Sequence, residues 1–116
     1  MKERPDKLDG VTYQILLDHI PDPINLTIND VDGKPYEVFI NCNDPKQLEW
    51  SPIASRLISA VLRNKGDNEF LYKELQELFS AEYFFYKGTK YHSIVQLIGS
   101  ILEDHANHLK EQNEIS

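Results

Sequence analysis

Apolar and polar residues alternate along three stretches in the first third of the chain, with the period of two of a half-buried β-strand. The stretches are residues 11–17, 24–28 and 36–42. The segment 29–33 separates the last two and ends in Asp32-Gly33, where glycine accepts positive φ and Asp side chains bond nearby backbone N–H groups. This pattern predicts a three-stranded antiparallel meander with a hairpin around Asp32-Gly33.

The alternation gives the predicted sheet one apolar and one polar face. The apolar face carries Val11, Tyr13, Ile15, Leu17, Ile24, Leu26, Ile28, Tyr36, Val38, Ile40 and Cys42. The opposite face carries Asn25, Thr27, Asn29, Glu37, Phe39 and Asn41. We expect this second face to be open to a partner.

After residue 50 the apolar period changes to that of a helix. Ser51-Pro52 provides an N-cap and a first-turn proline, and Gly66 marks the end of this helix. Its apolar stripe is Ile53, Ala54, Leu57, Ile58, Val61 and Leu62. Asp67 or Asn68 then caps a second helix, whose apolar positions are Phe70, Leu71, Leu75, Leu78 and Phe79.

An aromatic segment, residues 82–92, connects this helical pair to the last helix. Ser93 and Gln96 form a capping-box pattern, and apolar periodicity continues to about Lys110. The order of elements predicts an α+β fold, a three-stranded antiparallel meander followed by three helices packed on one face. We expect one domain spanning residues 1–116, with flexible ends at 1–10 and 111–116.

Composition narrows the functional classes. The 116 residues suffice for one domain, and no apolar run approaches the roughly 20 residues of a membrane span. The net charge of −7 disfavours binding to nucleic-acid backbones. The lone cysteine excludes an internal disulfide or a multi-thiolate zinc site. With no signal peptide in the N-terminal sequence, we expect a cytoplasmic protein without contact to membranes.

No assembled catalytic or metal motif is present in the sequence. Asp30 and Asp32 suggest calcium, but an EF-hand loop needs a glutamate at its twelfth position, so an ordinary turn is favoured. His105 and His108 lie three apart, yet two further metal ligands are missing, which favours an exposed helix end. Cys42 is in phase with buried strand positions and has no neighbouring base.

A triad around His19 and Asp18 would need a serine that the sequence does not place. We therefore expect no enzymatic activity, no cofactor and no metal.

Three motifs together resemble a known family. They are LTINDVDGKPYEVFINC at 26–42, SPIASRLISAVLRNKGDNEFLYKELQEL at 51–78 and KYHSIVQLIGSILEDH at 90–105. This combination is similar to the TSCPD domain near the C-terminus of adenosylcobalamin-dependent (class II) ribonucleotide reductases, and to small stand-alone relatives. The resemblance covers residues 4–108 and implies an accessory domain that docks on another protein.

The sequence also departs from that family. The Thr-Ser-Cys-Pro-Asp motif that names it is absent, and so are the cysteines that fuller members carry beyond the closing helix. A zinc or thiol-relay role is therefore not carried over. The cobalamin and radical chemistry of the reductase belongs to a catalytic domain that the resemblance does not include.

These observations lead to a functional prediction. We expect a non-enzymatic accessory or adaptor protein that binds a protein partner, with ribonucleotide reductase as the candidate. The predicted contact residues lie on the polar sheet face and in the aromatic segment: Asn25, Thr27, Asn29, Glu37, Asn41, Tyr83, Phe85, Lys87, Lys90 and Tyr91. The aromatics have a second interpretation, as packing between the last helix and the helical pair.

Two other functions and one assembly remain open at the level of sequence. A nucleotide-binding regulatory domain would use Arg56, Arg63, Lys87 and Lys90 for phosphates and stack bases on aromatic rings. A small acidic protein would instead sequester a nucleic-acid-binding partner. Exposed sheet edges also allow pairing into a homodimer.

Overall fold

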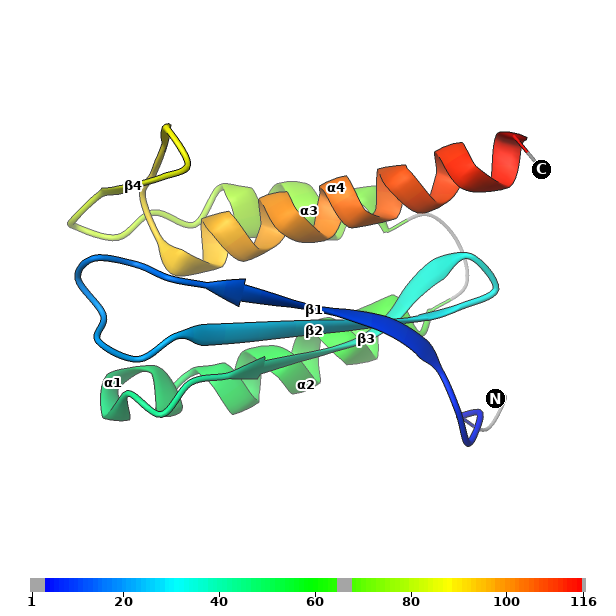
Figure 1. The fold of residues 1–116 in the computed structure, drawn as a ribbon, viewed down its shortest axis with the longest axis horizontal. Helices are drawn as coiled ribbons and strands as arrows, with labels where there is room; N and C mark the ends of the chain where they lie inside the picture. Colours follow the sequence, from blue (N-terminus) through cyan, green and yellow to red (C-terminus); the bar gives the residue numbers. More distant parts are fainter. Residues whose placement is uncertain (1–3, 65–67, 116) are drawn as a thin grey trace.

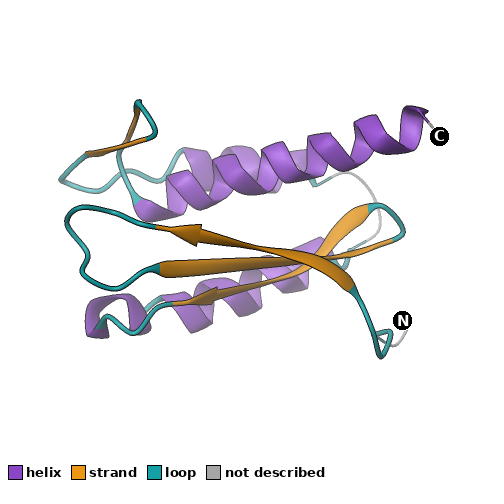
Figure 2. Ribbon diagram, in the orientation of Figure 1, coloured by secondary structure: helices purple, strands orange, loops and turns teal. Residues whose placement is uncertain are grey.

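The computed structural model describes residues 4–64 and 68–115. Three strands, β1 (Asp9–Ile15), β2 (Ile24–Val31) and β3 (Lys34–Asn41), form an antiparallel sheet in the order β1-β2-β3. The helices follow: α1 (Pro45–Leu48), α2 (Ser51–Leu62), α3 (Glu69–Gln76) and α4 (Ile94–Ile115). A small hairpin, β4 (Phe84–Tyr86) and β5 (Thr89–Tyr91), stands between α3 and α4 (Figures 1 and 2). The predicted α+β class and three-stranded meander are confirmed.

The β2–β3 hairpin turns at Asp32-Gly33, as predicted. Both residues have positive φ, 53° and 76°, which is the signature of a type I′ turn that matches the twist of the flanking strands. The ladder register shifts between Asn29 and Asp30, so that Asn29 pairs with Glu37 and Asp30 with Pro35. Tyr36 is the extra residue of this bulge.

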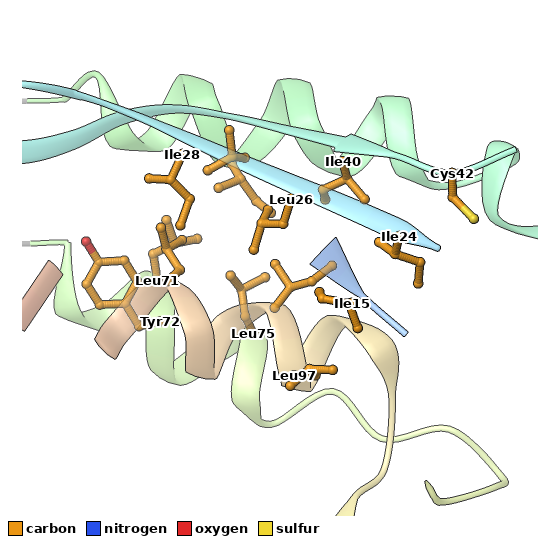
Figure 3. Close-up of a cluster of buried hydrophobic side chains, with 14 of the residues drawn as sticks. Ile15, Ile24, Leu26, Ile28, Ile40, Cys42, Leu71, Tyr72, Leu75 and Leu97 are labelled. Atoms are coloured by element: carbon orange, nitrogen blue, oxygen red, sulfur yellow. The ribbon is translucent and has the colours of Figure 1, made fainter. Parts of the chain in front are cut away.

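The hydrophobic core lies between the apolar sheet face and the helices. Ile24, Leu26 and Ile28 of β2 project toward Leu71 and Leu75 of α3 and Leu97 of α4 (Figure 3). Cys42 is buried at the end of this cluster, which confirms its interpretation as a small hydrophobic core residue. Leu17 lies beyond the end of β1 but is still buried.

Helix α2 packs along the outer edge of β3, which adds detail to the predicted packing of all helices on one face. Its serines meet the strand's backbone: Ser59 Oγ accepts from Val38 N–H (3.0 Å) and donates to Val38 O (3.2 Å). Ser55 Oγ accepts from Ile40 N–H (2.9 Å) and donates to Ser51 O (2.8 Å). Hydroxyl groups thus replace the neighbouring strand that this edge lacks.

This packing corrects part of the predicted apolar stripe of α2, of which Ile58 and Leu62 are buried as expected. Ile53 and Leu57, expected in the core, are 60% and 63% exposed, whereas Ser51, Ser55 and Ser59 are buried. The serines follow one another at every fourth position, so they share a helix face. They occupy the inner face because unpaired backbone groups of β3 need polar partners there.

Several element boundaries also differ from prediction. The N-cap of α2 is Trp50 rather than Ser51, and Asp44 caps α1, a short helix that the sequence pattern did not predict. Helix α4 runs to Ile115 instead of ending near Lys110. The predicted helix end at Gly66 and cap at Asp67 lie outside the described residues.

Candidate functional site

The aromatic segment forms a hairpin, where the sequence predicted only a connecting loop with a turn. Lys87 and Gly88 turn it with φ of 49° and 80°. Alternation along β4 separates its rings: Phe84 and Tyr86 pack against the core, while Tyr83 and Phe85 are 60% and 64% exposed. The packing interpretation therefore holds for Phe84 and Tyr86, and the other two rings are left exposed to solvent.

The outward rings of the hairpin form a compact cluster. The Tyr83 and Phe85 rings meet edge to face with centroids 6.0 Å apart. Lys90 Nζ lies 4.2 Å from the Tyr83 centroid, a cation–π geometry. The Tyr83 ring thus packs against both the Phe85 ring and the Lys90 ammonium.

A groove of about 550 Å³ lies beneath this cluster. It separates the hairpin from the loop after β1 and from the first turn of α4, and it is called the hairpin groove below. Its lining includes Leu17, Trp50 and Val95, with Asp18 and Glu82 as its charged groups. Apolar walls with a negative rim favour an aliphatic or aromatic side chain that lies next to a lysine or arginine.

The polar face of the sheet contains a buried charge cluster that the sequence did not reveal. Glu37 is only 1% exposed. Arg4 donates two hydrogen bonds to its carboxylate, from Nη2 to Oε1 at 2.7 Å and from Nε to Oε2 at 3.0 Å. Arg63 Nη2 lies 3.2 Å from Oε2, and Asn29 Nδ2 donates to Oε1 at 3.0 Å. Glu37 is therefore occupied within the chain and is not an exposed contact residue.

These partners also set the ionisation of Glu37. The hydrogen bonds from Arg4 lower the pKa of the Glu37 carboxyl, helped by Asn29 and by the charge of Arg63 and opposed by burial. Arg4 belongs to the segment expected to be a flexible end, and it joins that segment to β3. Asp9 and Gly10, also in the segment expected to be flexible, are part of β1.

His105 lies in a second buried polar cluster rather than at an exposed helix end. Its Nε2 is 3.0 and 3.1 Å from the two oxygens of Asp30, and its Nδ1 is 2.8 Å from the Tyr13 hydroxyl. Burial is the main reason why the pKa values of both Tyr13 and Asp30 are raised. These contacts tie α4 to β1 and β2.

The cluster around His105 does not contain a set of metal ligands. His108, the other histidine of the predicted pair, is exposed and lies 3.1 Å from Gln112 Nε2. Within residues 4–64 and 68–115, no three His, Cys, Asp or Glu side chains gather closely enough to hold a metal ion.

Two further clefts run along β1, on the side away from β2. One, of about 570 Å³, lies between Thr12-Tyr13-Gln14, the hairpin and α4, and has Asp104 and His108 in its lining. The other, of about 420 Å³, lies between Gln14 and Leu16 of the β1 region and Phe85 of the hairpin. Gln14, Tyr86 and Lys87 line both, so together they form one trough, called the β1 groove below.

A model of the TSCPD domain matches residues 1–106, which include the sheet, the hairpin and α4 as far as Ala106. The chain belongs to the TSCPD domain family. The two polar clusters of this TSCPD domain, around Glu37 and around His105, both lie within the matched range. Neither a search of curated proteins nor one of solved structures finds a match for the chain.

The structure distributes the predicted contact residues over two regions. On the sheet, Asn25, Thr27 and Asn29 are half-buried and Asn41 is exposed. On the hairpin, Tyr83, Phe85, Lys87 and Lys90 are exposed, and Tyr91 is half-buried against the core. The hairpin group lies together, whereas on the sheet Asn29 pairs with Glu37 and Asn25 pairs with Asn41 farther along the ladder.

The four residues predicted to bind phosphate are not brought into one cavity. Arg63 binds Glu37, and its guanidinium lies 5.2 Å from the Tyr36 ring centroid. Arg56 is an exposed residue of α2, and neither arginine lines the β1 groove that Lys87 borders. The ring of His19 lies tilted against that of Phe84, with centroids 5.1 Å apart.

Three features of the site were missed by sequence reasoning: the Arg4–Glu37–Arg63 cluster, the Tyr13–His105–Asp30 cluster and the β1 groove. A signal existed for the first, because Glu37 stands in the middle of a strand of apolar residues. The second joins residues 75 and 92 positions apart, which local patterns do not connect. No described helix is long and apolar enough to cross a membrane.

Proposed function

We propose that this TSCPD domain is a non-enzymatic accessory protein that binds a protein partner through the β4–β5 hairpin, with ribonucleotide reductase as the leading candidate. The exposed, mutually packed pair Tyr83–Phe85 supports this most directly. Large aromatic side chains are common anchors of protein interfaces, and solvent exposure of two adjacent rings is costly without a partner. The reductase is proposed because TSCPD domains occur in class II enzymes.

The setting of the rings favours protein recognition. Holding them rigid in advance reduces the entropy lost on binding. The hairpin groove beside them offers apolar walls from Leu17, Trp50 and Val95, and a negative rim from Asp18 and Glu82. A partner segment with an apolar anchor and a neighbouring Lys or Arg would match both properties.

The test is a direct titration of the purified domain with the ribonucleotide reductase encoded by the same genome. Wild type is compared with Tyr83→Ala/Phe85→Ala and with Phe39→Ala, because Phe39 is an exposed ring on the opposite, polar sheet face. We expect the hairpin variant to lose about tenfold or more in affinity, corresponding to about 1.4 kcal/mol or more. Phe39→Ala should bind like wild type.

Circular dichroism and urea unfolding must show that both variants remain folded. Loss of binding only with Phe39→Ala would move the interface to the sheet face. Absence of binding by wild type at about millimolar concentrations would reject the reductase as partner.

A further inference from the structure

The two edges of the main sheet differ in a way that bears on recognition. Along β3, the outward N–H groups of Val38 and Ile40 are bonded to serine hydroxyls of α2. Along β1, no strand of the described chain pairs with the side away from β2. An uncovered edge offers a row of backbone donors and acceptors to an incoming strand.

The uncovered edge also borders a prepared space. The β1 groove has the strand edge as one wall, and α4 with the tip of the β4–β5 hairpin as the other. Figure 1 shows α4 running beside β1 with the hairpin standing over the end of the strand. A trough between a strand edge and a helix accommodates one extended chain, since an added strand lies about 4.8 Å from its neighbour.

The lining of the β1 groove specifies the side chains that such a segment would carry. Leu97, Ile101 and Tyr91 line its apolar part, which suits an aliphatic or aromatic anchor. Asp104 and Asp18 border it, within a chain of net charge −7. The ammonium of Lys87 lies 5.4 Å from the Tyr86 ring centroid, in cation–π contact. This balance favours a segment with a basic residue next to its anchor.

We propose that the partner adds an extended segment to the free edge of β1, with an apolar anchor over Ile101 and Tyr91 and a basic side chain near Asp104. This inference rests on the proposed protein-binding function and names the form of the bound segment. The backbone of β1 supplies hydrogen bonds, while the groove selects side chains at alternate positions of the segment. Phe85 and Asp18 line both the hairpin groove and the β1 groove, so the two surfaces adjoin.

The first experiment uses random decapeptides displayed on phage and selected against the wild-type domain. Selected peptides are resynthesised with a single N-methyl group at each backbone amide in turn. Strand addition predicts a period of two: methylation of every second amide weakens binding by about tenfold, and methylation of the others is tolerated. Selection of no peptide, or tolerance of methylation at every position, would overturn the proposal.

A matched pair of variants locates the binding edge. Gln14 and Asn41 lie in one cross-strand row through Asn25, at opposite edges of the sheet, and both are exposed. Gln14→Trp fills the β1 groove, and Asn41→Trp adds the same bulk at the far edge. We expect Gln14→Trp to weaken peptide binding by about tenfold and Asn41→Trp to leave it unchanged. The reverse result would overturn the proposal.

The same variants separate this proposal from the proposed function. If the reductase binds wild type and Gln14→Trp equally well, the strand-addition model fails while the accessory role stands. If the selected peptides bind as predicted but the reductase does not, strand addition stands and the assigned partner fails. A wild-type dimer in sedimentation that Gln14→Trp dissociates would identify the occupant as a second copy, which overturns the proposal of a partner segment.

Discussion

Val11 and Val38 flank Ile28 in the same row of the sheet, one on β1 and the other on β3. They are the same residue type with the same cross-strand neighbour, yet Val11 is 45% exposed and Val38 is 1% exposed. The difference arises from what lies beside each strand: helix α2 covers the β3 edge at Val38, whereas no strand of the described chain pairs with the outer side of β1. Position in the alternation therefore fixes the face of a side chain but not its burial.

The two edges also differ in how their backbone groups are satisfied. Buried N–H and C=O groups need partners, and at β3 these are the hydroxyls of Ser55 and Ser59. At β1, solvent in the groove can serve the same groups. One edge is thus closed by a helix of the fold, and the other pairs with no strand of the described chain.

The largest expected effect comes from removing the serine hydroxyls of the covered edge. Ser55→Ala/Ser59→Ala leaves Val38 N–H, Val38 O and Ile40 N–H without their partners in a buried setting. We expect the free energy of unfolding to fall by about 2–5 kcal/mol, since each buried unsatisfied group costs about 1–3 kcal/mol. Urea unfolding measures this change. A loss below that of Thr12→Ala, which removes an exposed hydroxyl on β1, would contradict the covered-edge model.

The paired valines give the next largest effect. Val38→Ala should lower the free energy of unfolding by about 2–3 kcal/mol, because two buried methyl groups are lost and a cavity remains. Val11→Ala should cost less than about 1 kcal/mol, mainly through strand propensity. Thermal and urea unfolding of both variants test the contrast, and equal losses would show that the β1 edge is as well packed as the β3 edge.

The charge cluster on β3 gives a smaller effect that depends on pH. Glu37→Gln should cost about 1–2 kcal/mol at neutral pH through its hydrogen bonds to arginine. The folded pKa of Glu37 is lowered from 4.5, so its stabilisation is complete above that value and is lost as pH falls through the lower folded pKa. The stability difference between wild type and variant should therefore shrink as the pH falls below 4.5. A difference that stays constant with pH would contradict this.

Asp30 provides the control for that measurement, because its pKa is raised from 3.8, chiefly by burial. The carboxyl of Asp30 binds a proton more tightly in the folded than in the unfolded state. Its contribution to stability therefore declines as the pH rises from 3.8 through the raised folded pKa. Asp30→Asn should remove a trend of the opposite sign. The same trend in both variants would point to a global acid effect instead.

Nucleotides are expected to have no effect on the stability of the domain, and this prediction tests whether the β1 groove binds them. Arg63 is engaged with Glu37 and Arg56 lies on α2, so Lys87 is the cation in the groove's lining. We expect ATP, dATP and CTP to leave the melting temperature unchanged, because ligand binding to the folded state alone would raise it. A rise abolished by Lys87→Ala would favour the regulatory nucleotide-binding alternative.

Local periodicity predicted the sheet well. The turn at Asp32-Gly33 and the buried rows containing Leu26 and Ile40 all follow from alternation and turn chemistry. The cap of α4 followed from its motif in part. Ser93 Oγ accepts from Gln96 N–H at 2.9 Å, but the Gln96 side chain accepts from His92 N–H instead of closing the box on Ser93.

The candidate site was predictable only in part. Composition alone pointed to Tyr83 and Phe85 as candidate contact residues. The β4–β5 pairing that orients them was not predicted, because each strand has only three residues. The burial of Ser55 and Ser59 depends on a strand edge 15 to 21 residues away in the sequence. The apolar stripe placed Ile58 and Leu62 correctly but not Ile53 and Leu57, because it does not count the backbone groups that need partners.

The serine-covered edge of β3 has a consequence for stoichiometry. A sheet with two open edges can continue to recruit strands and grow into a fibre, but here extension can proceed in one direction only. Once β1 has received a single strand from another chain, further growth depends on the edge of that strand. Two copies joined through β1 would expose only serine-covered edges, so such assembly would stop at a closed pair.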